Sequence, residues 1–188
     1  MLRYVTTNPG KLREAQSYLG ADVIDDYDYD YPEIQAQTLE PIAAAGARDA
    51  YREVGGPVVV DDAGLFIEGF DGFPGPYSSF VEQTIGVDRV WELAEPLADR
   101  AAAFRCVLAY CDGTAVDDPV DDGDLPVRCF TGVVDGEIVA PRGDGGFGYD
   151  PIFEHDGETF AELTPEAKNE LSHRGRALEA FAAWYDDR

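Results

Sequence analysis

The sequence predicts an α/β protein in which helices flank a β-sheet. Short runs rich in Val, Ile and Tyr, which favour strands, alternate with longer runs whose apolar residues recur at helical spacing. The three valines at 58–60 have the composition of a strand that is covered on both faces of a sheet. With 188 residues, the chain is long enough for one domain with a sizeable core, undivided or in two lobes.

The charge balance is the most unusual property of the composition. The chain has 14 Lys and Arg against 38 Asp and Glu, a net charge of −24, and Lys11 and Lys168 are its lysines. An acidic surface with so few lysines indicates a halophilic protein, because in molar salt the Debye length falls to about 3 Å and the carboxylates repel one another little. An ordinary acidic protein would not need to avoid lysine. The same charge argues against a nucleic acid polymer as partner, which needs a basic surface.

The hydropathy pattern predicts a cytoplasmic protein without a membrane partner. No stretch is long and apolar enough for a membrane span, and the first residues lack the apolar segment of a signal peptide. Cys106, Cys111 and Cys129 lie in apolar, strand-like contexts without metal-ligand spacing. We therefore expect reduced cysteines in the core.

The chain begins with a predicted strand at 2–6, a turn and a helix at 12–19 that ends at Gly20. The turn Thr-Thr-Asn-Pro-Gly-Lys would place backbone N–H groups, the positive end of the helix and the Lys11 ammonium together, as an anion site requires. A plain turn with a surface lysine is the alternative, and the glycines of a Walker A loop are missing. A second helix is predicted at 41–54, between a proline and Gly55.

The valine strand runs into an acidic pair, Asp61 and Asp62. Ligands of open α/β sheets collect beyond the carboxyl ends of strands, so this pair is a candidate site for a hard cation. The pair could equally mark the point where the strand leaves the core for water.

Glu33 is a separate candidate carboxylate. The aspartates at 26, 28 and 30 do not form a calcium loop, because Tyr31 and Gln37 stand where Gly and Glu are needed.

The middle of the chain predicts a rigid Pro/Gly turn at 70–78, helices at 79–85 and 88–97, and long antiparallel strands at 104–111 and 127–134. Asp135-Gly136 is predicted to form a tight hairpin turn into a strand at 137–140. Residues 117–124 are expected to form a solvated acidic loop.

A glycine-rich segment follows. Its G-x-G-x-x-G spacing at 143–148 is not a dinucleotide fingerprint, because Tyr149-Asp150-Pro151 prevents the helix that must come next. The segment offers Phe147 and Tyr149 as an exposed aromatic face beside Asp150, which is how proteins hold a nucleobase. An aromatic core strand is the alternative.

The last helix is predicted to begin at Ser172, which can cap it. Positive residues in its first turn, His173 and Arg174, are unfavourable for the helix dipole, and this hints at a function. The apolar positions of its buried stripe are Leu178, Phe181, Ala182 and Tyr185.

Taken together and in order, these blocks resemble the inosine triphosphate pyrophosphatase family, which hydrolyses non-standard purine nucleoside triphosphates to the monophosphate and pyrophosphate. Both lysines fall inside the blocks, which cover nearly the whole chain. The blocks are residues 6–11, 32–33, 60–65, 72–77, 147–153 and 168–178.

The resemblance implies a long, mixed, twisted sheet flanked by helices, in a single domain over residues 1–188 with two lobes, a central substrate cleft and a homodimeric assembly. Glu33 and Asp62 would bind Mg²⁺, with Asp62 activating the attacking water and Asp61 supporting it. Thr6, Asn8 and Lys11 would cradle the phosphates. Lys11 thus joins Asp61 and Asp62 as a catalytic residue.

The remaining implied residues contact the purine nucleoside triphosphate. Lys168 would assist at the phosphates, and Phe147 would stack on the base. Donors that face a 6-oxo group would accept inosine and xanthosine and reject adenine, whose 6-amino group would meet another donor. The base edge would be lined by Asp150, Ser172, His173 and Arg174, and the other substrate-binding residues would be Thr7, Pro9, Gly10, Ala63, Gly148 and Tyr149.

Two positions depart from the family pattern. Gly46 and Ser79 stand where the family usually has basic residues, and Arg48 or Arg13 could compensate. Two alternatives therefore stay open. One is a related septum-inhibitor-type pyrophosphatase acting on pyrimidine or modified nucleotides, and the other is a nucleotide-binding protein that has lost catalysis.

Overall fold

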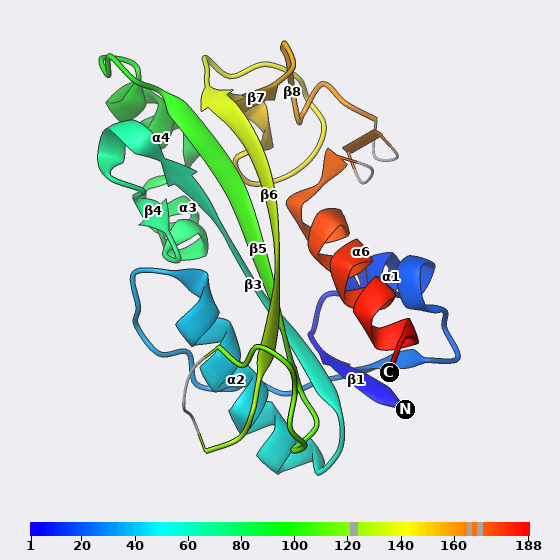
Figure 1. Ribbon diagram of the computed structural model, residues 1–188. Helices are drawn as coiled ribbons and strands as arrows, with labels where there is room; N and C mark the ends of the chain where they lie inside the picture. The colour runs from blue at the N-terminus through cyan, green and yellow to red at the C-terminus, as the bar shows by residue number, and fades with distance from the viewer. Residues whose placement is uncertain (121–123, 165–166, 169–170) are drawn as a thin grey trace. The chain divides into compact units, whose positions relative to one another are not determined.

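A computed structural model describes residues 1–120, 124–164, 167–168 and 171–188. Residues 121–123 of the predicted acidic loop, and 165–166 and 169–170 before the last helix, lie outside the described residues. The predicted α/β class is confirmed: the described strands form an eight-stranded sheet in the order β2-β1-β3-β5-β6-β7-β8, with β4 paired to β3 (Figure 1). The sheet is mixed, because β1 pairs in parallel with β2 and β3, whereas β6–β7 and β7–β8 are antiparallel.

The chain divides into two compact units. The first comprises Met1–Asp62, Cys106–Gly132 and Gly175–Arg188, and the second comprises Ala63–Arg105 and Val133–Arg174. None of the helices in the described residues is long and apolar enough to cross a membrane.

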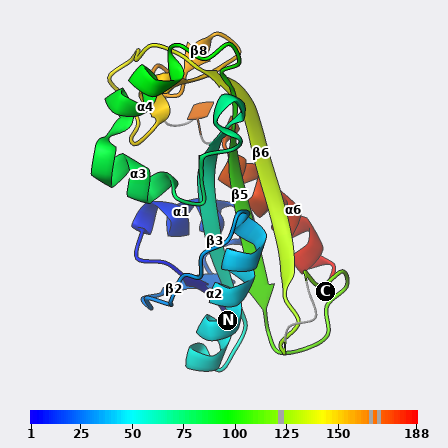
Figure 2. The ribbon, with the colours of Figure 1, turned by 90° about the vertical axis from the view of Figure 1, so that its left-hand side faces the viewer.

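The first unit contains β1 (Leu2–Val5), α1 (Pro9–Leu19), β2 (Ile24–Tyr27) and α2 (Leu39–Val54), with most of α6 (His173–Asp186). Helix α2 covers one face of the sheet in this unit, and α1 and α6 cover the other (Figures 1 and 2). The buried face of α2 is rich in alanine, and these small side chains let the helix lie close to the sheet.

Helix α1 begins three residues earlier than its apolar periodicity predicts. The side chain of Asn8 accepts hydrogen bonds from the N–H groups of Gly10 (2.8 Å) and Lys11 (3.4 Å), and Pro9 occupies the first helical position. These are the preferred residues for a helix start. The cap, rather than the first apolar residue, therefore sets the beginning of α1.

Strand β3 (Val58–Ile67) is longer than predicted, and this corrects the expected position of the acidic pair. Asp61 and Asp62 lie in the middle of the strand, not beyond its carboxyl end. Gly64 does not end the strand either. A Cβ at this position would lie 2.1 Å from the carbonyl oxygen of Gly75, so Gly64 lets β4 (Pro74–Gly75) approach the strand.

The predicted hairpin at Asp135-Gly136 is wrong. Both residues lie inside the continuous strand β6 (Arg128–Ile138), which pairs with β7 (Phe153–His155), and β7 pairs with β8 (Glu158–Thr159). A Cβ at Gly136 would lie 2.2 Å from the carbonyl oxygen of Glu154 and 2.6 Å from the ring of Phe153. This glycine lets two strands approach each other closely. In the sequence, an Asp-Gly pair with this role cannot be told from an Asp-Gly pair in a turn.

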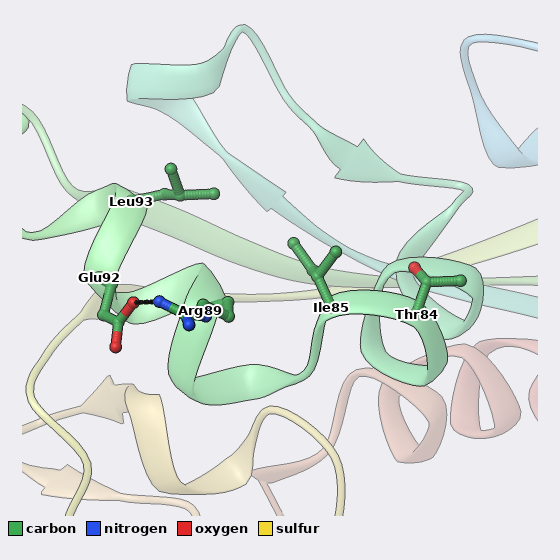
Figure 3. Close-up of a pocket in the computed structure, with 5 residues that line it drawn as sticks. All are labelled: Thr84, Ile85, Arg89, Glu92 and Leu93. Atoms are coloured by element: carbon green, nitrogen blue, oxygen red, sulfur yellow. Dashed lines mark hydrogen bonds and ion pairs between the residues drawn. The ribbon is translucent and has the colours of Figure 1, made fainter.

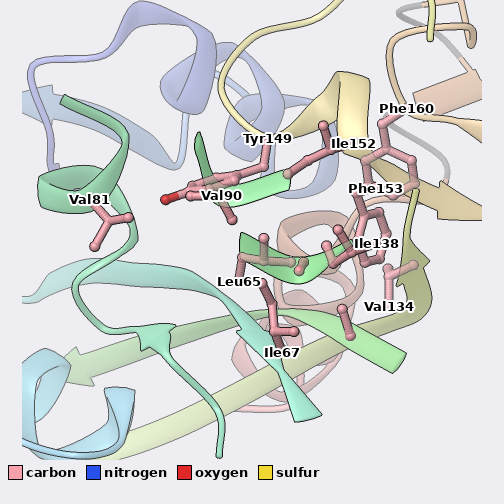
Figure 4. Packing of buried hydrophobic residues seen from close by; sticks show 12 residues of the cluster. Leu65, Ile67, Val81, Val90, Val134, Ile138, Tyr149, Ile152, Phe153 and Phe160 are labelled. Carbon is pink, nitrogen blue, oxygen red and sulfur yellow. The ribbon is translucent and has the colours of Figure 1, made fainter. Parts of the chain in front are cut away.

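The second unit contains η1 (Glu68–Phe70), α3 (Ser78–Ile85), α4 (Val87–Ala94), η2 (Asp150–Ile152) and the first part of β5 (Ala101–Cys111). Helix α4 ends before the predicted residue 97. An aromatic and aliphatic cluster fills this unit (Figure 4). Phe104 packs against Phe153 (ring centroids 4.6 Å apart) and Phe160 (5.8 Å). The buried members of the cluster are Leu65, Ile67, Val81, Val90, Ala94, Ala102, Val134, Ile138, Tyr149, Ile152, Phe153 and Phe160.

Two further predictions concern side chains of the core. The cysteines are free thiols, with Cys106 and Cys111 buried and Cys129 half-buried. On α6, Leu178, Phe181 and Ala182 are buried as predicted, whereas Tyr185 is half-buried.

Candidate active site

The centre of β3 holds a buried carboxylate, Asp61, whose side chain is 1% exposed. Its Oδ1 accepts hydrogen bonds from the Tyr4 hydroxyl (2.8 Å) and the Lys11 ammonium (2.9 Å). Its Oδ2 lies 4.0 Å from Cys106 Sγ. A buried carboxylate requires such partners, because burying an unpaired charge costs several kcal/mol. Asp61 therefore holds the Lys11 ammonium, which was predicted to contact phosphate, in one position at the start of α1.

Asp62 is half-buried and points away from Asp61, because successive residues of a strand face opposite sides of a sheet. Tyr31 also belongs to this region, although no sequence motif points to a role for it. Burial raises the pKa of Tyr31 first of all, and the charges of Asp61, Asp62 and Glu33 raise it further. The influence of all three carboxylates on one phenol indicates that Tyr31 lies near them.

The donor set suits Mg²⁺. Asp62 and Glu33 offer carboxylate oxygens, whereas Asp61 is already occupied by Tyr4 and Lys11. Among the described residues, no group of three or more His, Cys, Asp or Glu side chains is gathered as a metal site. Mg²⁺ does not need such a cage, because it keeps several waters and is bound through one or two carboxylates together with substrate phosphates.

The predicted anion turn is an ordered structure. Thr6 Oγ1 accepts the N–H of Asn8 (3.1 Å), and the Asn8 side-chain oxygen caps α1. The oxygen of the Asn8 amide is therefore in use, and its NH₂ group is the part that suits a phosphate oxygen. Thr7, Asn8 and Pro9 are exposed, and Gly10 and Ala63 are half-buried.

In the second unit, Phe147 is 74% exposed, the most exposed of the large apolar side chains in the described residues. The buried carboxylate of Asp150 accepts the N–H of Phe147 (2.7 Å) and pairs with the Lys168 ammonium. Lys168 Nζ in turn lies 4.1 Å from the centroid of the Phe147 ring. Gly146 is required here, because its φ is +71° and a Cβ would lie 2.2 Å from Asp150 Oδ2. Asp150 thus orders both the aromatic ring and the lysine.

Tyr149 does not belong to an exposed aromatic face, which corrects the prediction. It is 4% exposed, its ring joins the core of the second unit (Figure 4), and its hydroxyl donates to the carbonyl of Ser78 (2.8 Å). Burial, and then the charge of Glu82, raise the pKa of Tyr149 above its ordinary value. Asp150 is also buried, so its carboxylate supports the Phe147 segment from behind.

The start of α6 places His173 on the aromatic cluster. The His173 ring stacks on Phe104 with centroids 5.1 Å apart and planes at 12°. Ser172 is buried, and His173, Arg174 and Gly148 are half-buried. The stacking fixes the plane of the imidazole.

Comparison with known proteins decides the family. The Ham1 family matches this chain over residues 2–184. The chain belongs to the Ham1 family. A dITP/XTP pyrophosphatase of Thermococcus kodakarensis is 48% identical over 97% of this chain and 96% of its own length. The inosine triphosphate pyrophosphatase of Aspergillus fumigatus is 39% identical over 99% of this chain and 95% of its own. The resemblance drawn from the motifs is thereby confirmed.

Solved structures of the family share the fold. A HAM1 protein from Coxiella burnetii is 34% identical with a TM-score of 0.84, and the match covers 100% of both chains. The Ham1 protein of Staphylococcus aureus is 26% identical with a TM-score of 0.82. The mixed sheet flanked by helices is therefore the architecture of this family.

Both departures from the family pattern have a structural context in this Ham1 chain. A Cβ at Gly46 would lie 2.5 Å from the ring of Tyr31, so any side chain there would require the ring to move. Arg48, proposed to compensate, donates from Nε to the carbonyl of Leu125 (2.9 Å). Ser79 is exposed and accepts a hydrogen bond from Gln83 (3.0 Å). A Gly46→Lys substitution would therefore displace Tyr31 before it could add a phosphate contact.

An open pocket lies on helices α3 and α4, and none of the predicted site residues lines it (Figure 3). Arg89 and Glu92, two of its lining residues, form an ion pair along α4. Large apolar side chains on the same helices are exposed: Phe80 at 66% and Leu93 at 57%. The lining residues are Thr84, Ile85, Arg89, Glu92 and Leu93.

Proposed function

We propose that this chain is a Mg²⁺-dependent nucleoside triphosphate pyrophosphohydrolase. It converts ITP, dITP and XTP to the monophosphate and pyrophosphate, and so clears non-standard purines from the cytoplasmic nucleotide pool. The observation that carries the proposal is the centre of β3, where Asp61 holds Lys11 at 2.9 Å next to Asp62. The names of the relatives that match over nearly the whole chain support the same reaction.

The first unit would bind the triphosphate and activate water. Asp62 and Glu33 would hold Mg²⁺, which when bound neutralises charge on the phosphates. The Asp62 carboxylate orients a water and accepts its proton, and the water oxygen attacks the α-phosphorus. The bond from the α-phosphorus to the bridging oxygen breaks, and pyrophosphate leaves. The Lys11 ammonium donates to a phosphate oxygen while Asp61 holds it in place.

The second unit would recognise the purine. Phe147 stacks on the base, and Lys168 is the ammonium nearest to that ring. Donors at the start of α6 meet the 6-oxo group of hypoxanthine or xanthine. Adenine presents a 6-amino donor instead, and an unmatched buried donor costs about 1–3 kcal/mol, which corresponds to a large discrimination.

Pyrophosphate release from ITP, XTP, dITP, ATP and dUTP tests the proposal, with Mg²⁺ in molar KCl. The expected result is rapid release from the three non-standard purine nucleotides and slow release from ATP and dUTP. Preference for dUTP would favour the septum-inhibitor-type alternative. Binding of ITP without release of pyrophosphate would identify a nucleotide-binding protein that has lost catalysis.

Replacing Phe147 by Ala is expected to raise the KM for ITP about tenfold, because base–aromatic stacking contributes about 1–3 kcal/mol. The kcat should change little, since the ring contacts the base and not the phosphates. Steady-state kinetics with ITP measure both constants. Phe147→Tyr is the matched control and should keep the KM of the wild type. An unchanged KM in Phe147→Ala would contradict the stacking role.

We further propose that the chain is a homodimer that associates through α3 and α4. Phe80 and Leu93 are the most exposed apolar side chains on these helices, and an exposed apolar patch of this kind is typical of an interaction surface. The variant Phe80→Asp/Leu93→Asp is expected to be monomeric by light scattering after gel filtration. Ala180→Asp adds a charge on the exposed face of α6 and should leave the dimer intact. A monomeric wild type would contradict the proposal.

A further inference from the structure

The segment that joins β2 to α2 shows a regular alternation. Asp28 and Asp30 are exposed, whereas Tyr29 and Tyr31 are half-buried. In an extended chain, residues two apart point to the same side. The Asp-Tyr repeat therefore presents its aspartates to water and its tyrosines to one protein surface.

That surface is α2. The hydroxyl of Tyr29 donates to Asp49 Oδ2 at 2.7 Å. The ring of Tyr31 lies over Gly46, where a Cβ would be 2.5 Å from Cε2 and 2.9 Å from Cδ2. Gly46 and Asp49 are three residues apart, on neighbouring positions of one helix face. Glycine is unfavourable inside a helix, so the contact with the Tyr31 ring explains its presence better than helix propensity does.

The contact bears on Glu33, which follows Tyr31 after a single residue. Glu33 is exposed and lies in a stretch without helix or strand. The intervening Pro32 fixes its own φ and restricts the residue before it. With Tyr31 seated on α2, only a short and stiff connection remains between a packed ring and the Glu33 carboxylate.

We propose that Tyr29 and Tyr31, seated on Asp49 and Gly46 of α2, form a clamp that positions Glu33 to share a divalent cation with Asp62. This inference rests on the proposed function and deepens it. Tyr31 is a positioning residue in this scheme, and it makes no bond to the cation. Without the clamp, the Glu33 segment must lose its conformational freedom each time the cation binds, and the affinity falls accordingly.

Gly46→Ala tests the clamp, because the added methyl group occupies the place of the Tyr31 ring. The affinity for Mn²⁺ alone, measured from the EPR signal of the free ion, is expected to fall about tenfold. A loss of this size is common when a residue that supports a metal ligand is removed. The Mg²⁺ concentration for half-maximal pyrophosphate release should rise in parallel, with kcat at saturating Mg²⁺ nearly unchanged. Gly56→Ala is the matched control, since nothing lies within 4 Å of a Cβ there, and it should bind Mn²⁺ like the wild type.

A double-mutant cycle separates the clamp from a general effect on α2. Tyr31→Ser removes the ring and should weaken Mn²⁺ binding about as much as Gly46→Ala, whereas Tyr31→Phe keeps the ring and should bind normally. The double variant Gly46→Ala/Tyr31→Ser should be no weaker than Tyr31→Ser, because both changes break one contact. Losses that multiply instead would show that Gly46→Ala acts through the helix, and would overturn the clamp.

Two outcomes distinguish the levels of the proposal. If the wild type binds Mn²⁺ and all variants bind it equally well, the clamp is wrong and the metal site stands. If the wild type does not bind Mn²⁺ at millimolar concentration, the metal site of the proposed function is wrong, and the clamp falls with it. Thermal melting of each variant shows whether it is folded under the conditions of the titration.

Discussion

Asp62→Asn is expected to lower kcat for ITP by about 10³-fold, because the amide can neither accept the proton of the attacking water nor bind the cation as a carboxylate does. The substitution keeps the size and shape of the side chain in the middle of β3. The thermal midpoint should therefore change little. Pyrophosphate release under saturating ITP and Mg²⁺ measures the effect.

Two control variants make this expectation specific. Asp28→Asn removes an exposed carboxylate of the same unit and should leave kcat unchanged. Asp61→Asn keeps an acceptor for the Tyr4 hydroxyl but removes the negative charge that holds Lys11. It should lower activity by less than Asp62→Asn, because Asp61 supports the lysine and does not accept the proton. Full activity of Asp62→Asn would eliminate this residue as the base.

The second large effect is on stability. Gly64→Ala should lower the free energy of unfolding by about 3 kcal/mol, as overpacked core positions do. The new methyl group would lie 2.1 Å from the carbonyl oxygen of Gly75, and backbone cannot turn aside as a flexible side chain can. Ser78 links these strands, since its hydroxyl accepts the N–H of Leu65 (2.8 Å) and donates to the carbonyl of Gly75 (2.6 Å). Separation of β3 and β4 would strain this link as well.

Urea unfolding in molar KCl measures the loss. Gly56→Ala again serves as control, because its Cβ would meet no atom within 4 Å. A stability of Gly64→Ala equal to that of the control would mean that β4 does not lie against β3 as closely as the distance requires.

Most helices and strands could be predicted because their signals lie within a few residues of one another. The alanine-rich helix α2 and, apart from the half-buried Tyr185, the apolar stripe of α6 are local patterns and lie close to where they were predicted. The Asn8 cap is equally local but was not predicted, so α1 begins earlier than expected. The functional motifs were also readable, since their residue types and order are properties of the chain itself. The family assignment confirmed the resemblance drawn from them, and the roles of the single residues stay predictions.

The errors share one cause, which is that contacts between distant parts of the chain decide how a residue is used. Gly136 reads as a turn, yet it makes room for Phe153 and the backbone of Glu154. Tyr149 reads as part of an exposed face together with Phe147, yet its ring lies in the core and its hydroxyl reaches Ser78. No sequence pattern pointed to Tyr31, because its contact partner Gly46 is 15 residues further along the chain, on α2.

The α/β class, the strongly acidic composition and the family resemblance follow from the order and type of residues along the chain, and so does the predicted set of carboxylates, amides and lysines for a nucleoside triphosphate. Periodicity, capping and residue chemistry act over a few neighbouring residues, so they can be read directly. Three arrangements became visible in the folded chain alone: the acidic pair lies inside a long strand, Asp61 holds Lys11 while Asp62 faces the other side, and Tyr31 rests on Gly46. These arrangements depend on which distant backbones and rings come within van der Waals distance, and that is settled only when the whole chain packs.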